Sequence, residues 1–372
     1  MPSSNVSDTE SKELGFFLQE DTFLRKYIYH VWLCILIFGL GANSINIAVF
    51  TKIGLRDNVT LTLLVLSFSD LIHLILSFPI AVARFIEKYH PYHDWPFHPK
   101  ILFDGIYWWA FIFYDYSSFI SVFLGLVRCA CVSRPLRFKS MFTISRTVKV
   151  LVLLFLLALG LRAPVLTVFR LTWELNPITN STYRSIRFSA NYKEIYKANH
   201  IFNMNIVSWT TYVIAVGCVI VLTSNLKAAS RFRQSSQNAS SDSSENNQSE
   251  TATVNKQRST NSVKKKPANK MSVRDLQVIK SVTLLCVVFI VSQLPPQIRC
   301  TIRLIDPEFS EFGRKRFALG FSAQVSRTFG FLNASVNIFI HYYFNRRYRD
   351  TFLFTLSKMM CLHLGVEREP VH

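Results

Sequence analysis

The chain has 372 residues, of which 50% are hydrophobic and only 17% are charged. A soluble domain usually carries about 25% charged residues, so this composition argues against a soluble protein and favours one that lies in a membrane. The formal net charge is +19, and many of the Lys and Arg residues lie between the apolar stretches. This placement is typical of cytoplasmic loops, which explains the positive charge without nucleic-acid binding.

The apolar residues form seven stretches of about the 20 residues that a helix needs to cross a bilayer. They cover residues 28–50, 60–86, 103–131, 147–170, 199–224, 277–302 and 317–343. A backbone in lipid must satisfy its own hydrogen bonds, and barrel strands need only about 10 residues, so the stretches are predicted to be helices. The predicted fold class is therefore an all-α membrane protein, with a seven-helix bundle over residues 28–344.

Two polar segments flank or interrupt this bundle. Residues 1–27 are polar and acidic. Because Lys and Arg concentrate in the inner loops, we expect residues 1–27 to form an extracellular tail. Residues 234–262 are rich in Ser, Asn, Gln and Thr and almost lack apolar side chains. The third inner loop, about 228–272, is therefore predicted to be disordered.

The chain after the seventh stretch has an amphipathic pattern. Tyr348, Phe352 and Leu356 form an apolar stripe opposed by arginines. This pattern predicts a short helix on the membrane surface, followed by a cytoplasmic tail, within residues 345–372. Cys361 follows that helix and is either a palmitoylation site or a free thiol.

Asp70 lies in the middle of the second predicted helix, where an ionised side chain is costly and usually marks function. Polar side chains at similar depth in other helices are Asn43, Ser117, Asn333 and Asn337. Five oxygen-bearing side chains that meet in the membrane would hold a cation, such as sodium, together with waters. The alternative is a polar contact between helices without an ion.

Short motifs occur in order along the predicted helices. They are Gly41-Ala42-Asn43, Ser69-Asp70-Leu71, Val127-Arg128-Cys129, Phe289 six residues before Pro295, and Asn333 followed by Asn337-Ile338-Phe339-Ile340-His341. Their order and spacing resemble the rhodopsin-like (class A) family of G protein-coupled receptors over about residues 28–358. In the general character of its sequence, the chain is similar to invertebrate receptors for FMRFamide-type peptides and to molluscan chemosensory receptors.

The resemblance implies a plasma-membrane receptor with its N-terminus outside. It would bind an extracellular neuropeptide or a chemosensory small molecule and activate a heterotrimeric G protein inside, with arrestin as a further partner. Several positions depart from the family pattern: Val127 replaces an acid, Cys129 and His341 replace tyrosines, Gln293 replaces a tryptophan, Ile338 replaces a proline, and Phe103 stands where a disulfide cysteine is usual. No disulfide framework is expected among the seven cysteines.

Arg128 lies at the inner end of the third predicted helix, where the resemblance implies contact with a G protein. Asp275 lies twenty residues before Pro295, at the inner end of the sixth helix. Family geometry implies an ion pair between Arg128 and Asp275 that holds the resting state, and His341 belongs to the same coupling region. The alternative is that Arg128 extends to lipid headgroups.

The outer half of the predicted bundle is rich in arginine, with Asp104 and Asp115 as nearby acids. Candidate ligand-binding residues are Asp104, Trp108, Phe111, Arg162, Gln293, Arg299 and Arg327, and Arg84 and Arg303 lie nearby. The first three and Asp115 share one helical face. The surplus of positive charge predicts a ligand with an anionic group, because Arg binds carboxylates and phosphates bidentately. The alternative is a set of internal ion pairs, such as Asp115 with Arg162, and solvated arginines at the rim.

Two sequons, at Asn5 and Asn180, lie in predicted outer segments and are candidate glycosylation sites. His90, His93 and His98 lie close together, but a solvated loop is favoured over a metal site. We find no motif of a known enzyme class, no metal site and no cofactor apart from the sodium considered at Asp70. The competing function is a seven-helix channel or transporter, which would need a polar path through the whole bundle.

Overall fold

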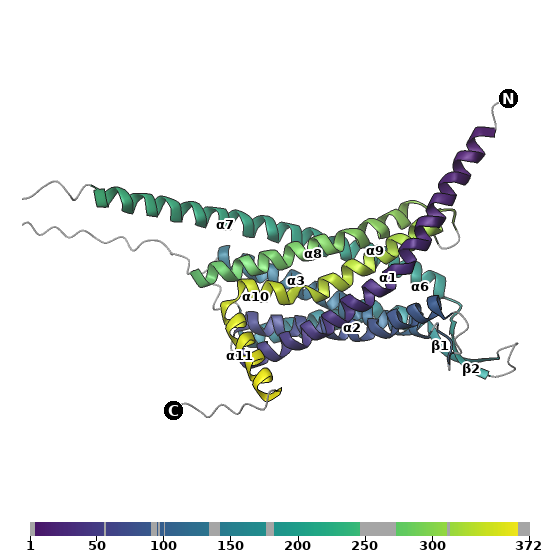
Figure 1. Cartoon of the computed structure of the whole chain (residues 1–372), viewed down its shortest axis with the longest axis horizontal. Coiled ribbons are helices and arrows are strands. Elements are labelled where there is room, and N and C mark those ends of the chain that lie inside the picture. The colour runs from purple at the N-terminus through teal and green to yellow at the C-terminus, as the bar shows by residue number, and fades with distance from the viewer. Residues whose placement is uncertain are drawn as a thin grey trace, which may run out of the picture.

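The computed structural model describes residues 4–55, 57–90, 95, 97–99, 101–133, 142–175, 182–245, 273–310 and 313–363. For residues 4–26, 229–245, 273–276 and 358–363 it describes the backbone alone. Figure 1 shows the described helices running side by side as an elongated bundle.

The long helices are α1 (Ser4–Ile53), α2 (Asn58–Tyr89), α3 (Tyr107–Ser133), α5 (Ile144–Leu166), α7 (Ser208–Glu245) and α8 (Val273–Ile305). Two π-helical segments, η1 (Ile101–Ile106) and η2 (Phe202–Val207), lead into α3 and α7, and α6 (Tyr192–Ile201) precedes η2. The chain continues through α9 (Arg316–Ser335), α10 (Asn337–Phe344) and α11 (Arg346–His363). Among the described residues, six helical stretches are long and apolar enough to cross a membrane.

The seventh stretch predicted from the sequence corresponds to α9 and α10 together. They are separated only at Val336, whose backbone stays in the right-handed helical region with φ of −82° and ψ of −9°. The Val336 N–H still donates to the carbonyl of Leu332 at 3.0 Å. The interruption is therefore a local irregularity within one span, and the seven-helix fold class is confirmed.

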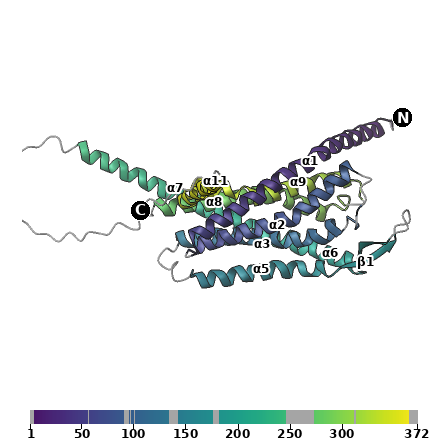
Figure 2. The same cartoon turned by 60° about the horizontal axis from the view of Figure 1, so that its bottom comes forward.

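Helix α3 forms the centre of the bundle, since it packs against α2, α5, α7 and α8. Buried side chains from several helices meet around it, including Phe50, Ile120, Leu124 and Leu222. Helix α5 lies at the edge, as Figure 2 shows, and leaves Leu153 64% exposed. Exposed leucines on a membrane span are expected to face lipid.

Helix α11 crosses one end of the bundle, where the amphipathic pattern predicts a short helix (Figure 1). Its packing against α1 was not predicted. Tyr348 is fully buried, and its hydroxyl donates to Asn46 Oδ1 at 2.5 Å. Lys52 Nζ donates to Thr355 Oγ1 at 3.1 Å, and Arg347 donates to the Ile53 carbonyl at 3.0 Å. Polar contacts therefore hold the first part of α11 against the end of α1.

The sequence did not predict the hairpin between the fourth and fifth spans. Strand β1 (Phe169–Leu175) pairs antiparallel with β2 (Thr182–Phe188), from Phe169 opposite Phe188 to Leu175 opposite Thr182. Both strands are rich in aromatic and β-branched residues, which favour extended structure. The all-α prediction therefore holds for the membrane spans and is wrong for this connection.

Two helices extend beyond their predicted limits. Helix α1 begins at Ser4, so much of the segment expected to be a tail is helical. Helix α7 continues to Glu245, so residues 234–245 are helical although disorder was predicted for them. Both extensions lack proline, and a chain already in helix adds further residues more easily than a new helix nucleates. Residues 246–272, the rest of the predicted loop, lie outside the described residues.

Candidate ligand cavity and buried polar clusters

A cavity of about 1120 Å³ opens among the helices at the hairpin end of the bundle. Helices α1, α2, α3, α5, α7, α8 and α9 all contribute to its wall, and Phe169 and Phe188 of the hairpin line it as well. The hairpin is held in place by backbone contacts, since the His98 N–H donates to the Arg184 carbonyl at 2.9 Å. The side chain of Ile186 packs over Gly105, where a Cβ atom would lie 3.1 Å from Ile186 Cδ1.

The structure brings every candidate ligand-binding residue to this one cavity. Its lining includes Asp104, Trp108, Phe111, Arg162, Gln293, Arg299 and Arg327. The lining carries seven basic side chains, Arg84, Arg162, Lys193, Arg299, Arg303, Arg316 and Arg327, against two acids, Asp104 and Asp115. The cavity is therefore electropositive, as the arginine-rich sequence predicts.

Arg162 is the most buried of these arginines and has a partner. Its Nε donates to Asp115 Oδ2 at 2.6 Å and its Nη2 to Asp115 Oδ1 at 3.1 Å. Nη1 donates to Asn199 Oδ1 at 3.4 Å. The ring of Phe111 lies 5.2 Å from the guanidinium carbon. This is the pairing of Asp115 with Arg162 considered from the sequence, and it neutralises the charge of Arg162.

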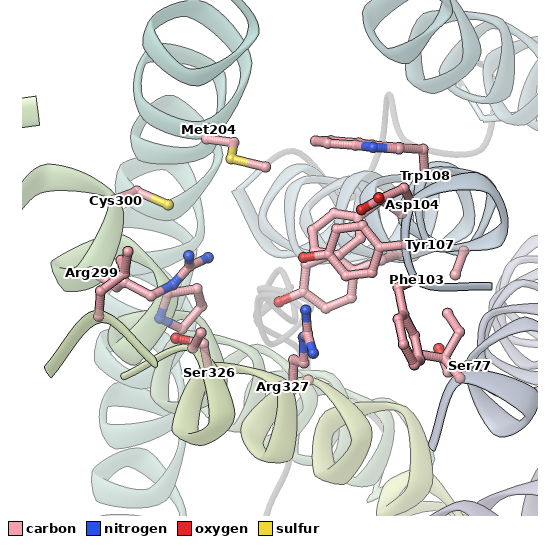
Figure 3. Close-up of a pocket in the computed structure, with 18 of the residues that line it drawn as sticks. Ser77, Phe103, Asp104, Tyr107, Trp108, Met204, Arg299, Cys300, Ser326 and Arg327 are labelled. Carbon is pink, nitrogen blue, oxygen red and sulfur yellow. The ribbon is translucent and has the colours of Figure 1, made fainter. Parts of the chain in front are cut away.

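Arg299 and Arg327 differ from Arg162, because neither has an ion pair or a hydrogen-bond acceptor among the described residues. The guanidinium carbon of Arg327 lies 5.0 Å from the ring centroid of Tyr107 and 5.9 Å from that of Trp32. The Nε of Arg299 is buried without an acceptor. Figure 3 shows both guanidinium groups pointing into the open centre, with Trp108 on the far wall.

Gln293 forms part of the cavity floor and links two helices. The hydroxyl of Tyr114 donates to Gln293 Oε1 at 3.1 Å, and Gln293 Nε2 donates to Ser118 Oγ at 3.0 Å. A second cavity of about 20 Å³ lies beside these groups and is also lined by Asn203 and Thr211. That space suits about one water molecule with several polar partners.

Sequence reasoning missed several aromatic residues of the cavity. Tyr107 and Tyr114 lie four residues before and three residues after Phe111, so helical spacing alone places all three on one face. Tyr192 and Tyr196 also line the cavity, but they precede the apolar part of the fifth span. Their spacing of four residues places them on one face of α6, but this short helix lies before the fifth span as predicted.

The buried cluster around Asp70 is smaller than predicted. Ser117 Oγ donates to Asp70 Oδ1 at 2.5 Å, and Asn337 Nδ2 donates to Asp70 Oδ2 at 2.9 Å. Asn43 instead donates to the backbone carbonyl of Ala334 at 2.7 Å. Within the described part of the chain no hydrogen bond joins Asn333 to Asp70. These contacts join α2 to α3 and α10, and the sodium ion considered from the sequence stays a prediction.

The residues assigned to G protein coupling lie toward the α11 end. Arg128 is half-buried on α3, whereas the side chain of Asp275 lies outside the described residues, so their pairing stays a prediction. His341 is 1% exposed and packs edge-on against Phe50 at 5.0 Å and near Tyr348 at 5.5 Å. His341 therefore lies inside the junction of α1, α10 and α11.

The remaining candidates concern modification. Asn180 lies outside the described residues, and the side chains of Asn5 and Cys361 are also outside them. The six cysteines whose side chains the structure describes are free thiols.

Comparison with known proteins identifies a family for this chain. The family model described as 7 transmembrane receptor (rhodopsin family) matches residues 42–341. No curated protein matches the chain.

Proposed function

Because this chain belongs to the rhodopsin family of seven-transmembrane receptors, we propose that it binds an extracellular ligand in the hairpin-end cavity and activates a heterotrimeric G protein at the α11 end. The observation that carries this proposal is the cavity of about 1120 Å³ with seven basic and two acidic side chains. The chain is a multi-pass membrane protein, and in this proposal its N-terminus lies outside the cell.

The ligand of this proposal carries an anionic group and an apolar or aromatic body. Arg299 and Arg327 supply donors for the acid, while Trp108, Phe111 and Tyr107 supply aromatic surface. The cavity volume of about 1120 Å³ slightly exceeds the range for small-molecule sites, roughly 300–1,000 Å³. A neuropeptide terminus or a chemosensory small molecule would fit it, as the resemblance to FMRFamide-type and molluscan chemosensory receptors suggests.

Signalling in this proposal depends on Arg128. In the resting state Arg128 pairs with Asp275, and ligand binding releases it toward the G protein. Val127 replaces the acid usual in the family, so this proposal assigns Asp275 as the partner of Arg128 on the basis of family geometry. The Ser- and Thr-rich residues 235–262 would receive phosphate, which adds about −1.5 to −2 charges per site and would recruit arrestin.

The test is expression of the full chain in cells with a promiscuous G protein, followed by a panel of peptides and small organic anions. We expect at least one anionic member to raise second-messenger output in wild-type cells. Arg128→Ala should abolish that response at equal surface level, and Asp275→Ala should raise output without ligand. Ligand-dependent output that persists in Arg128→Ala would contradict the assigned role of Arg128.

A further inference from the structure

Two arginines of the cavity, Arg299 and Arg327, are half-buried without an ion pair or a hydrogen-bond acceptor among the described residues. Lys193 and Arg316 of the same lining also lack an acid among the described residues, but they are exposed to solvent. Among the described residues Arg84 pairs with Glu87 at 3.0 Å and Arg162 with Asp115 at 2.6 Å. Arg299 and Arg327 have no such acid. Leaving a half-buried guanidinium without an acceptor costs free energy, so two of them in one cavity require an explanation.

The position of Arg327 is set by aromatic packing and not by a polar partner. Arg327 is held between the rings of Tyr107 and Trp32, at 5.0 Å and 5.9 Å from their centroids. Trp32 is itself fixed, since its Nε1 donates to Thr328 Oγ1 at 2.8 Å. Aromatic faces attract a guanidinium but leave its N–H groups free to donate. Arg327 is therefore oriented in advance for an anion.

Arg299 comes from the neighbouring helix and faces the same space. It lies on α8, which packs directly against α9, and Figure 3 shows its guanidinium and that of Arg327 reaching the cavity from adjacent walls. The wall opposite is aromatic, with Tyr107 and Trp108 labelled there. Each guanidinium has five N–H donors in a planar fork, which matches a carboxylate or phosphate.

We propose that the cavity recognises a dianionic ligand, one negative charge being held by Arg299 and the other by Arg327, with an aromatic body against the α3 wall. Arg162 takes no part in holding charge, because Asp115 already occupies it bidentately. The inference rests on the proposed function, since it assigns the ligand chemistry of the same cavity. The ligand is either a dicarboxylate or a phosphate ester, because both carry two negative charges.

The test uses the full-length receptor purified in lipid nanodiscs, without a G protein. The probes are phthalate, isophthalate and terephthalate, which vary the separation of two carboxylates, with phenyl phosphate as the phosphate arm. Each dicarboxylate is compared with its monoamide and its diamide. Binding is measured by calorimetry and by the shift in melting temperature.

We expect at least one dianion to bind wild-type receptor roughly tenfold to a hundredfold more tightly than its monoanionic counterpart, as for a charge-assisted hydrogen-bonded contact. In Arg299→Gln and in Arg327→Gln this preference should fall to about one, because each variant leaves a single guanidinium. Arg299→Lys and Arg327→Lys should keep part of it, since Lys keeps the charge but lacks the fork. Arg314→Gln is the matched control, because Arg314 is 86% exposed outside the cavity.

The outcomes separate the inference from the proposed function. Equal binding of dianion and monoanion, a preference that survives both glutamine variants, or no binding by any probe at millimolar concentration would each overturn the inference. If the receptor prefers dianions but activates no G protein in cells, the inference stands and the proposed function is wrong. G protein activation by a ligand, in a receptor that does not prefer dianions, would support the proposed function and overturn the inference.

Discussion

Asp115 and Arg162 form a buried ion pair inside the span region, and such pairs are costly to break. Asp115 is 9% exposed and Arg162 is 2% exposed, so both charges are removed from solvent. The attraction between them offsets desolvation only while both remain. Asn199 adds one hydrogen bond from α6, so the pair ties α3, α5 and α6 together at the wall of the cavity.

Asp115→Ala is expected to destabilise the receptor strongly, by about 3–5 kcal/mol, because it leaves the charge of Arg162 buried without an acid. The measurement is the melting temperature of purified receptor, together with its level at the cell surface. The double variant Asp115→Leu with Arg162→Met should recover most of the loss, since no charge is then buried. A melting temperature unchanged in the single variant would show that the pair does not stabilise the bundle.

At the residue scale, helical spacing was enough to place much of the site. Trp108, Phe111 and Asp115 share a face at spacings of three and four, and the structure puts all three on the cavity wall. Spacing could not reveal which arginines are already neutralised, because partners such as Asn199 come from elements distant in sequence. The same limit explains why Asn43 was expected near Asp70, whereas it binds the backbone of α9.

At the scale of elements, α1 and α9 approach closely where Gly39 meets Ser335. A Cβ atom at Gly39 would overlap the Ser335 hydroxyl and lie 2.7 Å from Leu74 Cδ1. The Ser335 hydroxyl is itself engaged, donating to the Phe331 carbonyl at 2.7 Å. Small residues commonly permit such contacts between membrane helices.

Gly39→Ala is therefore expected to destabilise the receptor by about 1–3 kcal/mol, because the added methyl group has no space. The control is Gly41→Ala on the same helix, where a Cβ atom would meet nothing within 4 Å. Alanine favours a helix over glycine by roughly 0.5–1 kcal/mol, so the control should be neutral or slightly stabilising. Thermal unfolding in detergent compares the two variants, and equal melting temperatures would refute the packing argument.

The elements themselves were predictable to different degrees. The seven spans follow from apolar length, since lipid leaves the backbone few alternatives to helix. The hairpin of β1 and β2 was predictable in part, because Phe169–Leu175 alternates strictly between apolar and polar residues, the pattern by which a strand is recognised. The extensions of α1 and α7 were missed because polar composition was read as loop, although polar residues without proline continue an existing helix.

At the scale of the whole molecule, the two ends of the bundle have different chemistry. The cavity, the hairpin and the start of α1 lie at one end, whereas α11 and the far end of α7 lie at the other (Figures 1 and 2). With seven spans the two termini fall on opposite sides of the membrane. The basic segments that flank α11 and follow α7 favour the cytoplasmic side for that end.

This orientation predicts which sequons carry glycans, since only segments on the lumenal side meet the glycosylation machinery. Glycans are expected on Asn5 and Asn180, and not on Asn238 or Asn247, which follow the fifth span. Enzymatic removal of N-glycans should shift the wild-type band on a gel, Asn5→Gln and Asn180→Gln should each reduce the shift, and the double variant should lose it. Asn238→Gln with Asn247→Gln is the matched control and should leave the shift unchanged. A glycan found on Asn238 or Asn247 would place the cavity on the cytoplasmic side, where no extracellular ligand could reach it.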